Sequence, residues 1–202
     1  MYVHKYIDIS RSFSFKIRDI SRSIILDILS FGIEERNKKL LKTPRIQFVY
    51  LHHIFEDEIK IFDNLIFDLK KIYDIIPFSE AIKRVHTNNI DRPYLAFSSD
   101  DGFKSNLNAH EVFLKHNISA CFFLCTEFIG LDNYDRIKEI CENKFQLPPT
   151  EFLNKNDIKF LINKGHEIGS HTTNHSNLKT LSSKDLNSTI KDSFTYIKNL
   201  IG

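Results

Sequence analysis

At 202 residues the chain has the length of one ordinary domain, and its 42% hydrophobic residues, 18 phenylalanines among them, supply enough apolar material for a substantial core. The chain has 28 lysines and arginines against 26 aspartates and glutamates. The resulting net charge of +2 creates no strong electrostatic field of one sign. This balance argues against a disordered chain and gives no support for binding to nucleic acid.

The three cysteines of the chain, Cys121, Cys125 and Cys141, cannot all pair within one molecule. The first two lie in one apolar run rather than at the spacing of a zinc knuckle, which predicts buried free thiols in a reducing compartment. No stretch reaches the roughly 20 apolar residues that span a bilayer, and the N-terminus lacks the pattern of a cleaved secretory signal. We therefore expect a soluble cytoplasmic protein.

Residues 1–43 are the first unit that the sequence sets apart. Apolar side chains recur there at helical spacing, with arginines toward the polar side: Ile17, Ile20, Ile24, Ile25, Ile28 and Leu29, with Arg11, Arg18 and Arg22. This pattern predicts a helical extension that packs on the main domain. A basic amphipathic helix can instead lie on a membrane, which would place the protein at the inner membrane surface, although Asp19 and Asp27 oppose this alternative.

From residue 44 onward the sequence predicts alternating strands and helices. The expected strands cover residues 46–51, 94–98, 118–124 and 166–169. The expected helices cover residues 57–74, 105–116 and 154–164, and a last one opens at Ser182, with Leu186, Ile190, Phe194 and Ile197 as its apolar positions. The alternation predicts parallel strands wrapped by helices, with functional groups on the loops that follow the strands.

Two of these loops carry side chains that suit a metal site. His171 and His175 lie four residues apart after one strand, and Asp100 and Asp101 follow another, with Gly102 easing the turn. Two imidazoles and one carboxylate can hold a zinc ion, and the second carboxylate can serve as a general base. Each motif alone is commonly a plain turn or a pair of structural histidines, but together they suggest a metal hydrolase.

These motifs resemble signatures of the polysaccharide deacetylase family, also called the NodB homology domain or carbohydrate esterase family 4. The run from Gly165 to His175 resembles the second signature, and the run from Ser99 to Gly102 resembles the first. Less specific similarities occur at residues 51–53, 121–124, 126 and 128–130. The resemblance spans roughly residues 45 to 200.

The resemblance implies a distorted (β/α) barrel of the NodB type over residues 44–202 and the removal of acetyl groups from N-acetylated, less often O-acetylated, sugars of a glycan or glycan precursor. It implies that Asp100 is the general base and that Asp101, His171 and His175 bind a divalent metal ion. Zinc is the expected ion, with cobalt or nickel as alternatives, and the expected partner is an N-acetylated oligosaccharide or polysaccharide.

Three other histidines receive lesser roles. The strand residue His166 matches a position of the family pattern that is not a ligand, and we expect it to pack against its neighbours. His52 and His53 point toward the same end of the barrel, where a peripheral role is the most that the sequence suggests.

The chain also departs from the family pattern. Ser99 stands where the family usually carries an aromatic residue, a change that could loosen the packing around Asp100. The family's later arginine and histidine segments, which stabilise the oxyanion and donate a proton, do not occur before Gly202. We therefore expect a barrel that is incomplete at its C-terminus. The alternative function is that of a catalytically impaired or truncated domain that binds metal and a glycan or a partner.

Overall fold

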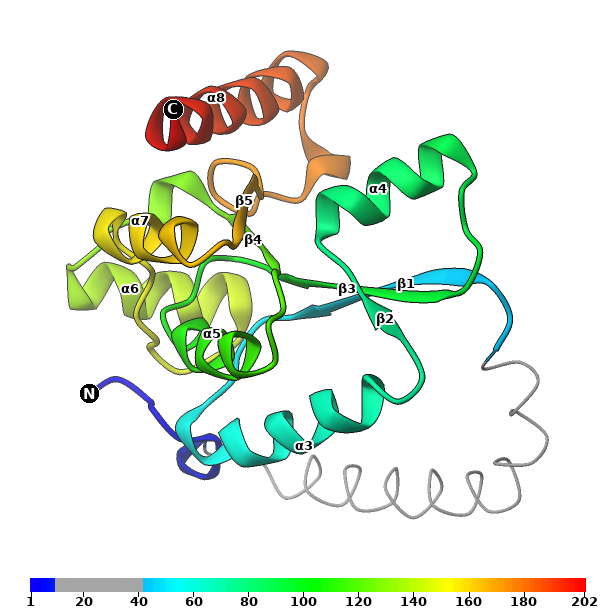
Figure 1. Cartoon of the computed structure of the whole chain (residues 1–202). Coiled ribbons are helices and arrows are strands. Elements are labelled where there is room, and N and C mark those ends of the chain that lie inside the picture. The colour runs from blue at the N-terminus through cyan, green and yellow to red at the C-terminus, as the bar shows by residue number, and fades with distance from the viewer. Residues whose placement is uncertain (10–41) are drawn as a thin grey trace.

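A computed structural model describes residues 1–9 and 42–202, and Figure 1 shows how their strands and helices are arranged. The helix expected in the N-terminal extension falls largely on residues 10–41 and so lies outside the described residues. The described part of the extension contains a short 3-10 helix, η1 (Tyr6–Asp8). No helix within the described ranges is long and apolar enough to cross a membrane.

A parallel sheet of five strands forms the centre of the fold. Four strands lie side by side in the order β1 (Arg45–Leu51), β3 (Pro93–Ser99), β4 (Cys121–Leu124) and β5 (Glu167–Ser170). β3 pairs with β1 over its full length, and its other edge is shared by β4 and the two-residue β2 (Asp74–Ile75). Among the described residues β1 does not pair with β5, so the sheet is open there. The expected α/β class with parallel strands is confirmed.

Helices connect the strands and cover the sheet. The α-helices of the described residues are α3 (Ile59–Leu69), α4 (Phe78–Thr87), α5 (Asn106–Lys115), α6 (Tyr134–Ile140), α7 (Lys155–Asn163) and α8 (Ser183–Ile201). Shorter 3-10 segments are η2 (Glu56–Glu58), η3 (Thr126–Phe128) and η5 (Leu178–Thr180), and η4 (Cys141–Phe145) is a π-helical turn. Figure 1 shows α3 and α4 on opposite sides of the sheet.

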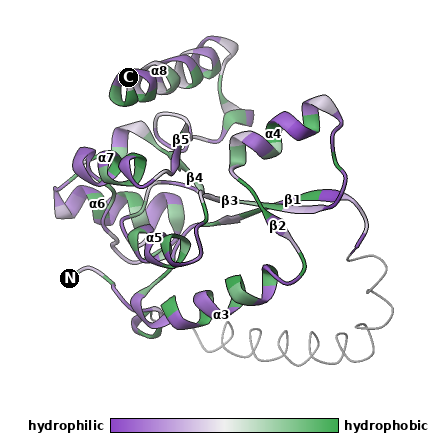
Figure 2. Cartoon of the chain, viewed as in Figure 1, coloured by the Kyte–Doolittle hydropathy of each residue, from purple (hydrophilic) through white to green (hydrophobic). Residues whose placement is uncertain are grey.

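The main hydrophobic core lies between the sheet and the helices α3, α5 and α7. Successive strand residues face opposite sides of a sheet, and Leu95, Phe97, Phe122 and Leu124 share the side that faces these helices. The helices contribute Phe62, Ile66, Phe113, Ile158 and Leu161. Figure 2 shows green, hydrophobic stretches alternating with purple ones along α3 and α4, as expected of helices with one buried face.

A second cluster lies under the loops that follow β3 and β4. It consists of Phe103, Cys125, Phe128, Ile137, Ile140, Cys141 and Phe152. All three cysteines of the chain are free and buried, as the sequence predicts. This cluster supports the ends of the strands rather than the faces of the sheet.

Local signals in the sequence explain where some helices begin. The Asn154 side chain accepts hydrogen bonds from the N–H groups of Asn156 and Asp157, at 2.8 and 3.0 Å, and so caps α7. Ser182 accepts a bond from the Asp185 N–H at 3.2 Å at the start of α8. Both caps are predicted by the sequence.

The predicted helix over 57–74 ends earlier than its apolar spacing suggests. α3 stops at Leu69, because Asp74 and Ile75 leave the helix to pair with β3 as β2. The sequence analysis did not predict α4, which begins directly after Pro77. Proline is compatible with the start of a helix, so its presence marks a new helix as well as the end of an old one.

α8 faces the sheet with a different side from the one that its apolar residues predict. It buries Thr189, Ser193 and Ile197, whereas Ile190 and Phe194 are 48% and 61% exposed. The reason lies in the partners, because the Ser170 and Thr173 hydroxyls lie 2.6 Å from the hydroxyls of Ser193 and Thr189, respectively. Hydroxyl pairs therefore set the rotation of α8, and two of its four predicted apolar positions, Ile190 and Phe194, face away from the sheet.

The start of α4 is attached to the opposite face of the sheet. The Phe78 ring contacts the rings of Phe48 on β1 and Phe123 on β4, with centroids 5.1 and 5.2 Å apart. The Ser79 N–H donates to a Glu167 carboxylate oxygen at 3.0 Å, and the Ser79 hydroxyl donates to the other oxygen. An anionic side chain from β5 thus binds the positive end of the helix dipole of α4.

Two buried histidines join α5 to the beginning of β5. The Ala120 N–H donates to Nδ1 of His166 at 3.1 Å, so the proton of this ring must be on Nε2. This Nε2 lies 2.8 Å from Nδ1 of His110 and donates to it. Both rings are buried and neutral in this arrangement, and burial lowers the pKa of His166 from 6.5 to about 4. His166 therefore packs in the interior, as expected.

We expect acid to destabilise the fold through this pair. In the unfolded chain His166 is protonated below its ordinary pKa of 6.5, whereas in the folded chain it is protonated only below about pH 4. The stability that the neutral ring contributes is therefore present above about pH 6.5 and is lost as the pH falls toward 4. The loss attributable to this ring is about 2 kcal/mol. Urea unfolding measured between pH 7 and pH 4.5 checks this.

The matched variant is His166→Gln, which can still form hydrogen bonds but does not titrate. Its free energy of unfolding should vary less with pH than that of the wild type. An identical pH dependence in the two proteins would show that the His166 ring does not control the acid sensitivity.

Candidate metal centre

The turn after β3 carries both aspartates and has an unusual backbone. Asp101 and Gly102 have φ angles of 71° and 83°, in the left-handed region that residues other than glycine seldom adopt. A side chain at position 102 would also come close to Leu124, with its Cβ 3.2 Å from Cδ2. The turn therefore needs glycine at 102, and it holds Asp101 in a conformation that is costly for an aspartate.

The loop after β5 carries the two histidines and is bonded to the segment after β4. The His171 N–H donates to the Leu124 carbonyl oxygen at 2.9 Å. Two further bonds, of 3.2 and 2.9 Å, join the same segments: Thr126 N–H to the Thr172 oxygen and Glu127 N–H to the Thr173 oxygen. His175 itself has a φ of 57°, so this loop also contains costly backbone. Neighbouring parallel strands thus bring the histidine loop and the aspartate turn to one edge of the sheet.

At this edge three side chains converge on a small volume. Nε2 of His171 and Nε2 of His175 each lie 3.4 Å from Oδ1 of Asp101. One ligand atom from each of the three residues can be chosen so that all lie within 4.8 Å of one another. Asp101 is only 2% exposed, whereas the side chains of His171 and His175 are 32% and 39% exposed. The carboxylate thus forms the floor of the cluster, and the two imidazoles face the solvent side.

The residues of this cluster fit a divalent metal ion. Oδ1 of Asp101 is buried and has no hydrogen-bond partner among the described residues, an arrangement that costs free energy unless a cation or a proton satisfies the atom. Burial raises the pKa of Asp101, whereas the neighbouring imidazoles of His175 and His171 oppose this rise. Two imidazole nitrogens and one carboxylate oxygen are a common donor set of catalytic zinc sites.

Asp100 lies beside this cluster and outside it. Its N–H donates to the carbonyl oxygen of Leu51 at 3.0 Å, which attaches the turn to the end of β1. The Asp100 side chain is partly exposed, so solvent can reach it. The role of Asp100 as a general base, like those of Asp101, His171 and His175 as metal ligands, stays a prediction.

The neighbouring histidines His52 and His53 take different directions. Nε2 of His52 lies 3.9 Å from Oδ2 of Asp101, which makes it a third imidazole facing this carboxylate. His53 turns away, and its Nδ1 lies 2.9 Å from the Ser105 hydroxyl oxygen while its ring packs against Phe103, with centroids 4.1 Å apart. Burial lowers the pKa of His53 to about 4, so this ring is neutral. The sequence analysis placed both histidines at this end of the barrel with a peripheral role, and of the two only His52 faces Asp101.

Two supporting residues escaped the sequence analysis. The Cys125 thiol donates to the carbonyl oxygen of His171 at 3.2 Å and so helps to fix the histidine loop. The Phe145 ring lies 5.0 Å from the His175 ring and also contacts Phe103, which follows the aspartate turn. One aromatic cluster thus supports both segments that carry the candidate ligands. An apolar residue in a connecting segment carries no sequence signal of such a role.

Ser99, which differs from the family pattern, is buried in the structure. Its side chain is 1% exposed, and its hydroxyl oxygen has no hydrogen-bond partner among the described residues. A buried hydroxyl without a partner costs free energy directly beside the aspartate turn. The serine therefore leaves a buried polar atom unsatisfied next to Asp100.

A parallel α/β domain with an Asp-His-His cluster at the carboxyl ends of its strands belongs to a class of folds that commonly place metal and substrate sites at this edge. Residues 87–202, more than half of the chain, match the family model described as polysaccharide deacetylase. The chain belongs to the polysaccharide deacetylase family.

Several solved structures share this fold. IcaB from Ammonifex degensii aligns with a TM-score of 0.62 at 14% identity, over 80% of this chain and 71% of that one. The deacetylase PplD of Streptococcus pyogenes, solved in complex with acetate, aligns with a TM-score of 0.59 at 18% identity, over 79% and 69%. A polysaccharide deacetylase from Bacillus cereus aligns with a TM-score of 0.56 at 15% identity, over 79% and 48%. No curated protein matches the chain in sequence.

We expect the cluster to bind a transition-metal ion, which a titration with Co²⁺ followed by visible absorption can measure. Replacing a ligand should weaken the affinity at least about tenfold, because the two remaining donors form an incomplete site. The variants are Asp101→Asn and His175→Ala. The control is His86→Ala, which removes an exposed imidazole of α4 outside the cluster. Equal Co²⁺ affinity of His175→Ala and His86→Ala would contradict the assignment.

Proposed function

We propose that the chain is a metal-dependent hydrolase that removes acetyl groups from N-acetylated sugars of a glycan or glycan precursor. One observation carries the proposal: Asp101, His171 and His175 converge within 4.8 Å, directly beside a second aspartate that solvent can reach. Membership of the polysaccharide deacetylase family supports the same reaction class. Zinc is the proposed ion, because its preference for nitrogen and oxygen ligands matches this donor set.

In this proposal three residues bind the metal ion and Asp100 transfers protons. Asp101, His171 and His175 hold the metal ion, which when bound increases the acidity of water and polarises the acetyl carbonyl group. Asp100 accepts a proton from the attacking water as the water oxygen bonds to the carbonyl carbon. The bond between carbon and nitrogen then breaks, and the proton held by Asp100 passes to the leaving nitrogen. The products are acetate and a sugar with a free amine.

The surroundings of the cluster support this division of roles. Asp101 is buried at the base, so it cannot easily exchange with water, whereas Asp100 beside it is accessible to a water molecule. A nearby positive ion favours the ionised form of both carboxylates, and Asp100 must be ionised to accept a proton. Hydrogen bonds between the histidine loop and the segment after β4 hold the ligands in position before substrate arrives.

A second candidate function is binding of metal and a glycan without hydrolysis. The buried, unpartnered hydroxyl of Ser99 favours it, because the residue before Asp100 lacks the aromatic packing typical of the family. A base whose position varies transfers protons less efficiently. The two candidates differ in what they require of Asp100.

We expect Asp100→Asn to reduce acetate release from N-acetylated oligosaccharides at least about 100-fold, because the amide cannot accept the proton of water. Its Co²⁺ affinity should stay close to that of the wild type, since Asp101, His171 and His175 are intact. Acetate is measured in an enzyme-coupled assay on the metal-loaded chain. The control Asp132→Asn makes the same change at an exposed residue outside the cluster and should keep full activity.

Two results would separate the candidate functions. If the wild type binds metal and oligosaccharide but releases no acetate, the binding function replaces the enzymatic one. If Asp100→Asn releases acetate as fast as the wild type, the chain is an enzyme with a different base.

A further inference from the structure

The candidate ligand His175 lacks the hydrogen bond that usually orients a metal-binding imidazole. Its Nε2 lies 3.4 Å from Oδ1 of Asp101, whereas its Nδ1 has no hydrogen-bond partner within residues 1–9 and 42–202. Histidines that bind a metal almost always donate the other ring N–H to an acceptor, which fixes the orientation of the ring. The His175 side chain is 39% exposed, and its backbone belongs to no helix or strand. Another contact must therefore hold this ring.

The ring of Phe145 supplies such a contact. Its centroid lies 5.0 Å from that of the His175 ring, with an angle of 45° between the two planes. Among the described residues the only other ring contact of His175 is with His171, at 5.4 Å, and that ring is itself a candidate ligand. An aromatic pair at such a separation is stabilising beyond the area that it buries. Packing against Phe145 therefore restricts the rotation of the imidazole.

Two stacked rings support Phe145 in turn. The rings of Phe103 and Phe152 have centroids 5.0 Å apart and planes inclined by 21°, and both residues are buried. Phe145 contacts the Phe103 ring edge-on, with centroids 5.0 Å apart. Phe103 directly follows Gly102 of the aspartate turn, so the stack connects Phe145 to the segment that carries Asp101.

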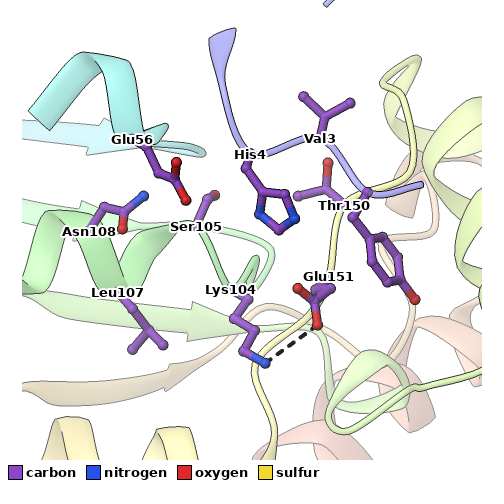
Figure 3. A pocket seen from close by; sticks show the side chains of 10 residues that line it. Val3, His4, Glu56, Lys104, Ser105, Leu107, Asn108, Thr150 and Glu151 are labelled. Carbon is purple, nitrogen blue, oxygen red and sulfur yellow. Dashed lines mark hydrogen bonds and ion pairs between the residues drawn. The ribbon is translucent and has the colours of Figure 1, made fainter. Parts of the chain in front are cut away.

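Hydrogen bonds fasten the stacked rings to the aspartate turn. The Leu153 N–H donates to the Gly102 carbonyl oxygen at 2.8 Å, and the Lys104 N–H donates to the Glu151 carbonyl oxygen, also at 2.8 Å. Lys104 Nζ lies 3.4 Å from Glu151 Oε1, an ion pair that Figure 3 draws as a dashed line in the wall of a cavity of about 190 Å³. The residues on both sides of each stacked ring are thus bonded to one another, so the stack cannot shift independently of the turn.

Phe145 itself stands at the end of an uncommon helical turn. The π-helical turn η4 closes its hydrogen-bonded ring with one more residue than an α-helix does, which changes the direction of the side chains that follow. The next residue, Gln146, has a φ of 54°, in the left-handed region. Single π-helical turns frequently occur at functional sites. The backbone after α6 therefore departs from an α-helix in the turn that ends at the residue whose ring contacts His175.

We propose that Phe145 is a positioning residue that sets the orientation of the His175 imidazole toward Asp101. The inference rests on the proposed function, in which His175 binds the metal ion. It adds that a packed ring does here what a hydrogen bond to the second ring nitrogen does at most metal-binding histidines. Phe145 acts only through His175, because a phenylalanine side chain has no donor atom for a metal ion.

The test compares Phe145→Leu with Phe62→Leu, which removes a ring of the main core on α3, outside the metal cluster. Phe145→Leu should weaken Co²⁺ binding about tenfold, as loss of a residue that orients a ligand does, and should change the visible absorption of the bound ion. Phe62→Leu should bind Co²⁺ as the wild type does, although it lowers the free energy of unfolding. Phe145→Tyr retains the ring at this partly exposed position and should retain the affinity.

NMR of the histidine side chains in the metal-free chain gives a second measurement that does not depend on the metal. The variant His175→Ala identifies the signals of His175. In the wild type, the couplings that report the χ1 angle of His175 should correspond to one rotamer, and in Phe145→Leu they should correspond to an average over several.

The two measurements distinguish failure of this inference from failure of the proposed function. If the wild type binds Co²⁺ and Phe145→Leu binds it equally well, the inference is overturned and the proposed function stands. If the wild type binds no Co²⁺ but Phe145→Leu still loses the single rotamer, Phe145 orients His175 and the proposed function fails. A His175 side chain that already averages over rotamers in the metal-free wild type overturns the inference.

Discussion

The arrangement of the candidate site depends on one buried carboxylate, that of Asp101. Its Oδ1 has two imidazole nitrogens at 3.4 Å and no hydrogen bond among the described residues. Burying such an atom is unfavourable, and the chain accepts this cost together with a left-handed backbone at the same residue. Unfavourable terms that coincide at one residue are typical of functional sites, where a ligand compensates for them. The surrounding loops can be understood as the structure needed to hold this carboxylate against the two histidines.

Much of the fold could be predicted from the sequence, because hydrophobic periodicity and capping residues act locally. The central strands and the helices α5 and α7 follow from such signals, and Asn154 and Gly165 bound α7 as expected. The end of α3 and the face of α8 could not be predicted, because each depends on a partner far away in the chain. α3 ends where β3 accepts β2, and α8 is rotated by hydroxyl pairs to Ser170 and Thr173.

The candidate site likewise has features that the sequence predicts and features that it does not. The spacing of His171 and His175 and the adjacent aspartates were visible as motifs, and the structure brings Asp101 and both histidines together. The position of His52 could not be predicted, because it depends on β1 lying beside β3 in one particular register. The contribution of Phe145 depends on the path of a connecting segment that has no regular pattern. Sequence motifs thus indicated the donor atoms, whereas the residues that orient them became visible only through packing.

The bond between Ser79 and Glu167 has a consequence for how the chain folds. These residues are 88 positions apart, and closing a loop of that length costs entropy that local helix formation does not repay. During synthesis on the ribosome, α4 emerges well before β5, so the Glu167 carboxylate can bind the first turn of α4 only after β5 has been made. Contacts of such high sequence separation slow folding. We therefore expect the contact between Ser79 and Glu167 to form late in folding.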